Sequence, residues 1–122
     1  SFLTMLPLAE EPGLQILDQD KNWMWPDPVE NGVLVNTGEF LNRWTNGRFL
    51  PTPHRVVPPK HDRYSIATFF NPDSETSSEA LNTCVSADNP AKFETTSMQA
   101  YVEHYIDTNY LRGAGGTQEN VA

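Results

Sequence analysis

Short apolar runs separated by turn residues make up most of the chain. Alternating or β-branched runs of the kind that form strands occur at residues 2–6, 14–17, 32–36, 53–57 and 63–70. A shorter apolar run at residues 23–25 ends at Pro26. Prolines, glycines and the dipeptide Asn46-Gly47 mark the turns between these runs. The pattern therefore predicts about six strands and a mainly β fold.

Helical signals are confined to two places. Residues 38–44 follow an apolar strand and fit a single helical turn. Thr96 and Gln99 have the spacing of a capping box with Thr96 as the N-cap, and they predict one C-terminal helix. One face of that helix should pack on the sheet, because its apolar residues recur at helical spacing: Met98, Tyr101, Val102, Tyr105 and Ile106. We expect a domain over residues 1–112 and a disordered tail over residues 113–122.

Composition and charge exclude several classes of partner. The chain has 122 residues, enough for one small domain, and a net charge of -8. An acidic surface repels phosphate backbones, so no nucleic-acid partner is expected. No apolar run approaches the roughly 18–20 residues that span a bilayer, so no membrane partner is expected either. Cys84 is the single cysteine, which excludes an internal disulfide and favours a cytoplasmic location.

One group of residues has the chemistry of a metal and carboxylate site. His54 lies in an apolar strand, and Arg63 and Ser65 are two residues apart on the next predicted strand. If Val56 pairs with Arg63 in a hairpin, His54 faces Ser65 and the three side chains share one face. A neutral imidazole binds Fe(II), and a guanidinium with a hydroxyl binds a carboxylate. The alternative is that His54 is a hydrogen-bonded core or rim residue without a ligand.

Other polar and aromatic residues have simpler explanations. His61 and His104 are expected in solvent, and Asp18 with Asp20 fits a polar hairpin loop better than a metal site. Cys84 has no histidine or other base nearby in the sequence, so a nucleophilic role is not expected. The tryptophans are expected to pack in the core or at its rim rather than to stack on nucleic-acid bases: Trp23, Trp25 and Trp44.

Several strings, taken together, resemble a known enzyme family. These strings are Asn36-Thr37-Gly38-Glu39, Leu41-Asn42-Arg43-Trp44-Thr45-Asn46-Gly47-Arg48, His54-Arg55-Val56-Val57, Asp62-Arg63-Tyr64-Ser65 and Phe69-Phe70. In order and spacing they are similar to the isopenicillin N synthase-like branch of the Fe(II)/2-oxoglutarate oxygenases. The resemblance runs from Phe2 to about Pro72. One departure is Glu39, where the family usually has aspartate.

The resemblance implies an incomplete double-stranded β-helix, or jelly roll. His54 is then the second histidine ligand of a non-haem iron, and Arg63 and Ser65 bind the distal carboxylate of the co-substrate 2-oxoglutarate. The implied enzyme is a dioxygenase that uses Fe(II), O2 and 2-oxoglutarate to hydroxylate or desaturate a small organic substrate. Two alternatives are a same-family oxidase, whose Arg63 and Ser65 grip the substrate carboxylate, and a non-catalytic jelly-roll binding module.

The first metal motif of the family, His-x-Asp, does not occur in the chain. By alignment of the strand at residues 2–6, this motif is expected to end one or two residues before Ser1. We therefore expect this chain to be a fragment, inactive by itself, that needs the missing N-terminal part of its own domain.

Overall fold

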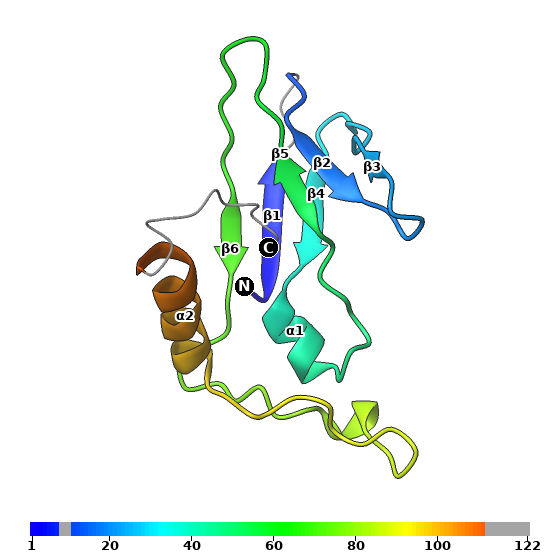
Figure 1. Cartoon of the computed structure of the whole chain (residues 1–122), viewed down its shortest axis with the longest axis vertical. Coiled ribbons are helices and arrows are strands. Elements are labelled where there is room, and N and C mark those ends of the chain that lie inside the picture. The colour runs from blue at the N-terminus through cyan, green and yellow to red at the C-terminus, as the bar shows by residue number, and fades with distance from the viewer. Residues whose placement is uncertain (8–10, 112–122) are drawn as a thin grey trace.

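Two small antiparallel sheets and two α-helices form the structure (Figure 1). This computed structural model describes residues 1–7 and 11–111, so the predicted domain end at residue 112 and the predicted tail lie outside the described residues. In the described part the chain forms six strands, which confirms the expected mainly β fold. No helix in these residues has the length and apolar character needed to cross a bilayer.

The first sheet has the strand order β4 (Val33–Thr37), β1 (Leu3–Pro7) and β6 (Thr68–Phe70). β1 is the central strand, and Leu6 pairs with Leu34 of β4. Leu6 is buried, whereas Val33 and Val35 are about half exposed. Because side chains alternate along a strand, the face that carries Leu6 and Leu34 is the inner face of this sheet.

The second sheet has the order β3 (Trp23–Met24), β2 (Leu14–Leu17) and β5 (His54–Val56). Leu14 is buried and defines the inner face. On the opposite face the Arg55 guanidinium lies 4.2 Å from the centre of the Trp23 ring, and Arg55 Nε donates to Gln15 Oε1 at 2.9 Å. Trp23 is 38% exposed, so of the two predicted positions, core or rim, it occupies the rim.

Helix α1 (Glu39–Trp44) begins directly after β4, with Gly38 as its N-cap. The Gly38 amide donates to the carbonyl of Phe2 at 2.8 Å, and a Cβ at residue 38 would overlap the carbonyl of Ser1. Glycine is therefore required by the close approach of two backbones. After the helix, Asn46 and Gly47 have φ angles of 51° and 87°, which confirms the predicted turn.

The segment from residue 71 to residue 97, which includes the short helix η1 (Asn82–Cys84), leads into helix α2 (Met98–Ile106) and its continuation η2 (Asp107–Leu111). Phe40 of α1 is fully buried, and its ring makes edge contacts with Trp44 and Tyr101. Helix α2 thus contacts α1 through Tyr101, whereas the sequence predicted packing on the sheet.

The cap of α2 is shifted by one residue from the prediction. Ser97, not Thr96, is the N-cap, because its Oγ accepts the amide of Ala100 at 3.1 Å. The Thr96 amide instead donates to the buried hydroxyl of Ser78 at 2.9 Å. That bond fixes Thr96 to the preceding loop, so the helix starts one position later.

The predicted hairpin between residues 53–57 and 63–70 is wrong. β5 pairs with β2 in the second sheet and β6 pairs with β1 in the first, so the connection between them crosses from one sheet to the other. Pro58 and Pro59 have no N–H for a continuing ladder, and the amide of Val57 already donates to Gly13. Of the predicted strand, only residues 68–70 pair with β1, and the last pair is Thr68 with Met5. The ladder does not continue two positions farther along β1, because Pro7 has no N–H to donate. Residues 57–67 form the long arm at the top of Figure 1.

Candidate functional site

His54 begins β5 on the inner face of the second sheet. It pairs with Ile16, which is two residues from the buried Leu14, so the three side chains share one face. The ring is part-buried, and Nδ1 lies 3.0 Å from the carbonyl oxygen of Thr52. A carbonyl only accepts, so Nδ1 carries the hydrogen and the lone pair of Nε2 is left for another partner. This is the tautomer and orientation that a metal-binding histidine needs.

The Arg63 side chain joins the crossover that leads to β6 to the segment that leads to β2. Arg63 precedes β6, yet its Nε donates to the carbonyl of Glu11 at 3.2 Å, and its side chain lies against Gly13, just before β2. Among the described residues, Arg43 forms an ion pair with Glu39, whereas Arg63 has no carboxylate partner. A part-buried guanidinium without a carboxylate is notable in a chain with twice as many acidic as basic residues. It is suited to bind an anionic ligand.

The backbone separation of the two positions follows from the sheet. The carbonyl of Gly13 accepts the amide of Val57 at 2.8 Å, so the Arg63 guanidinium lies at the level of Val57. Val57 comes just after β5 and is three residues from His54, which corresponds to a backbone separation of about 10 Å.

Ser65 lies in the extended segment that leads into β6, and its side chain is exposed. The pairing of His54 with Ser65 that a hairpin would give does not occur, because His54 pairs with Ile16 of β2 and Ser65 lies outside the strands. Ser65 is two residues from Arg63, so an extended backbone turns both side chains to the same side. The structure thus brings Arg63 to Glu11 and Gly13, just before β2, and Ser65 lies two residues farther along the crossover toward β6.

The remaining candidates have no site around them. Over residues 1–7 and 11–111 there is no group of three or more histidine, cysteine, aspartate or glutamate side chains able to hold a metal ion. His61 and His104 are exposed, as expected. Asp18 Oδ1 accepts the amide of Asn22 at 2.8 Å, which confirms a role in the loop. Cys84 is a free thiol.

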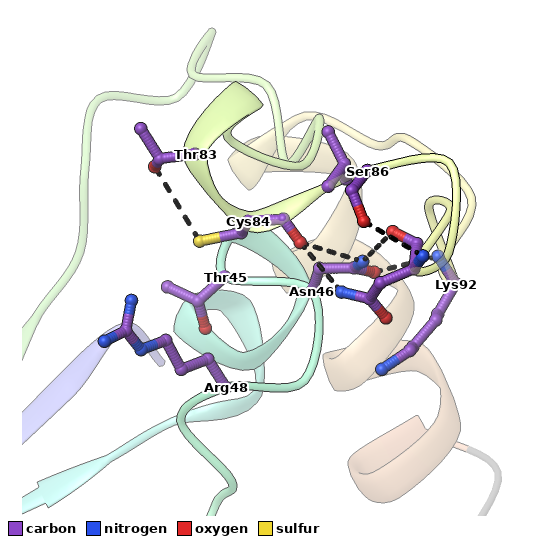
Figure 2. A pocket seen from close by; sticks show the side chains of 9 residues that line it. Thr45, Asn46, Arg48, Thr83, Cys84, Ser86 and Lys92 are labelled. Atoms are coloured by element: carbon purple, nitrogen blue, oxygen red, sulfur yellow. Dashed lines mark hydrogen bonds between the residues drawn. The ribbon is translucent and has the colours of Figure 1, made fainter.

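Sequence reasoning missed the role of Asn46, which lies beside a surface pocket of about 350 Å³ (Figure 2). The side chain is 2% exposed, and its Nδ2 donates to the carbonyls of Cys84 and Pro90 at 3.2 and 3.1 Å. Its Oδ1 accepts the amide of Lys92 at 2.9 Å. Asn46 therefore fastens the loop of residues 84–92 to the end of α1. The Asn-Gly dipeptide indicated a turn, but nothing local indicated this distant partner.

Comparison with known proteins gives one consistent family. Residues 1–72 match the 2OG-Fe(II) oxygenase superfamily. The chain is 36% identical over 121 residues to 1-aminocyclopropane-1-carboxylate oxidase homolog 11 of Arabidopsis thaliana, covering 96% of this chain and 32% of that protein. It also resembles the crystal structure of a full-length Neurospora crassa protein in complex with alpha-KG and thymine, with a TM-score of 0.79 and 32% identity, covering 88% of this chain and 34% of that one.

A third similarity, to the dioxygenase for auxin oxidation in rice, has a TM-score of 0.74 and 28% identity, and covers 88% of this chain and 37% of that one. The chain thus spans about a third of the length of these relatives. These similarities confirm the predicted jelly-roll class for the two facing sheets. The family match covers more than half of the chain, which therefore belongs to the 2OG-Fe(II) oxygenase superfamily.

Proposed function

We propose that the protein that carries this chain is a non-haem Fe(II)/2-oxoglutarate-dependent dioxygenase that hydroxylates or desaturates a small organic substrate with O2. The observation that carries the proposal is the pair formed by His54 and Arg63. Nε2 of His54 lies on the inner face of β5 without a partner among the described residues, and the Arg63 guanidinium, which has no carboxylate partner there, lies against Gly13, just before the neighbouring strand β2. The alpha-KG bound to the similar Neurospora crassa protein is 2-oxoglutarate, which supports this choice of co-substrate.

In this proposal His54 is a metal ligand. The carbonyl of Thr52 holds the hydrogen on Nδ1 and so directs Nε2 at the metal. The described residues supply no second or third ligand beside it. We assign those ligands to a His-x-Asp motif in an N-terminal part of the same domain, which the chain needs for activity.

Arg63 and Ser65 are the proposed binding residues for the distal carboxylate of 2-oxoglutarate. The guanidinium offers its two terminal nitrogens as a fork, and the hydroxyl of Ser65 adds a third donor. When bound, iron and 2-oxoglutarate supply O2 activation and the oxidation of the substrate. The residues of this chain orient the co-substrate and neutralise its charge. We further propose that the protein belongs to the isopenicillin N synthase-like subfamily and is located in the cytoplasm.

The test uses the full-length protein that carries this chain. We expect Fe(II)- and O2-dependent conversion of 2-oxoglutarate to succinate, which His54→Ala should abolish. The same change should weaken Zn(II) binding, measured by calorimetry, by at least about tenfold, because a ligand is lost. His104→Ala, which removes an exposed histidine from α2, is the matched control and should change neither result. Succinate formation that survives in the His54 variant contradicts the assignment.

A second candidate is an oxidase of the same family that does not use 2-oxoglutarate. It is favoured by the name of the Arabidopsis relative, a 1-aminocyclopropane-1-carboxylate oxidase homolog. In that case Arg63 and Ser65 bind the carboxylate of the substrate instead. Binding of 2-oxoglutarate to the Zn(II)-loaded full-length protein separates the two, since only the dioxygenase should bind it.

A further inference from the structure

The guanidinium of Arg63 is held at one nitrogen only. Nε donates to the carbonyl of Glu11 at 3.2 Å, whereas the two terminal nitrogens have no hydrogen bond to the described residues. A guanidinium has five N–H groups, and those on the terminal nitrogens form the fork that matches a carboxylate. The bond at Nε therefore orients the guanidinium and leaves its two terminal nitrogens available to a carboxylate.

Gly13 makes room for this arrangement. A Cβ at residue 13 would stand 2.7, 2.8 and 2.9 Å from Nε, Cζ and Cδ of Arg63, all closer than real contacts allow. Among the described glycines only Gly47 has a positive φ, so the backbone at Gly13 does not itself require glycine. The missing side chain at this position thus serves the contact with Arg63. Because the clashing atoms belong to a flexible side chain, an alanine there should move Arg63 rather than unfold the strand.

Glu11 holds the same arginine through a second route. Its carboxylate Oε1 accepts the amides of Lys60 and His61 at 3.1 and 3.4 Å. Those amides belong to the turn that immediately precedes Arg63. The backbone of Glu11 thus fixes the side chain of Arg63, and its carboxylate fixes the turn from which Arg63 extends.

We propose that Gly13 and Glu11 are positioning residues that aim the terminal nitrogens of Arg63 at the distal carboxylate of the co-substrate. The inference rests on the proposed function, since it assigns a purpose to the contacts of Arg63 within that site. It predicts that changes at Gly13 or Glu11 lower the affinity for a 2-oxo dicarboxylate and leave the affinity for a 2-oxo monocarboxylate unchanged.

Calorimetry on the Zn(II)-loaded full-length protein tests this without turnover. The probes are 2-oxoglutarate and pyruvate, which has the same chelating 2-oxo acid group and no distal carboxylate. In Gly13→Ala the Kd for 2-oxoglutarate should rise about tenfold to a hundredfold, the effect of losing one charge-assisted hydrogen bond. The Kd for pyruvate should stay at the wild-type value, which also shows that the variant is folded.

Two changes at Glu11 give an independent measurement. Glu11→Ala removes the acceptor for the Lys60 and His61 amides and should also weaken 2-oxoglutarate alone, whereas Glu11→Gln keeps an acceptor oxygen and should restore wild-type affinity. If Gly13→Ala loses pyruvate binding as well, that variant is perturbed beyond Arg63, and the comparison of Glu11→Ala with Glu11→Gln tests the positioning role instead. Wild-type affinity for 2-oxoglutarate in the Gly13 and Glu11 alanine variants overturns the positioning role and leaves the proposed function standing. If the wild-type protein does not bind 2-oxoglutarate, both the positioning role and the proposed function are wrong.

Discussion

Asn46→Ala should be among the most destabilising single changes in the chain. The side chain is 2% exposed, and it binds the loop of residues 84–92 through donors on Nδ2 and an acceptor on Oδ1. Its removal loses at least two net hydrogen bonds of about 1 kcal/mol each and leaves buried backbone groups without partners, so about 2–4 kcal/mol is expected. Alanine at a φ of 51° adds about 1 kcal/mol.

Two further variants separate these contributions. Asn46→Gly removes the hydrogen bonds but keeps the left-handed backbone, and should destabilise by about 2–4 kcal/mol. Asn31→Ala is the matched control, because Asn31 has a φ of 57° but an exposed side chain. It should cost only the backbone term of about 1 kcal/mol.

The assay is urea unfolding of the full-length protein, together with hydrogen exchange of the Lys92 amide. That amide should exchange faster in both Asn46 variants, because Oδ1 is its acceptor. Asn46→Gly with wild-type stability, or a Lys92 amide that remains protected, would refute the view that this side chain fastens the loop.

Two other predictions use the same unfolding measurements. Gly38→Ala should destabilise the protein by about 1–3 kcal/mol, because its Cβ would overlap the carbonyl of Ser1 and one backbone must move; unchanged stability would contradict this close approach. Burial, with the Glu39 carboxylate nearby, raises the pKa of Tyr101 to about 12. A folded pKa above the unfolded value gives stability that is present below pH 10 and lost as the pH rises to about 12. The Tyr101→Phe variant should therefore lose less stability between pH 10 and pH 12 than the wild-type protein does. Equal losses in the two proteins would contradict the raised pKa of Tyr101.

Local patterns in the sequence determined most of the strands and the start of α1. The run at residues 14–17 has the observed bounds of β2, and the runs at 2–6 and 32–36 differ from β1 and β4 by one residue at each end. Apolar alternation and turn residues act over a few positions, so they can be read without knowing the partners. Residue types and spacing singled out His54, Arg63 and Ser65 as a candidate site, the resemblance assigned their roles, and those roles remain a proposal.

The tertiary structure alone decided which strands pair and what the site residues contact. Alternation indicates that residues 63–70 are extended, but it says nothing about the sheet they join, and the chain crosses to β1 rather than folding back on β5. The contact of Arg63 with Gly13 and the bonds of Asn46 to residues 84–92 join segments more than 35 positions apart. Such contacts depend on which surfaces the whole chain buries together, and no local window of sequence contains that information.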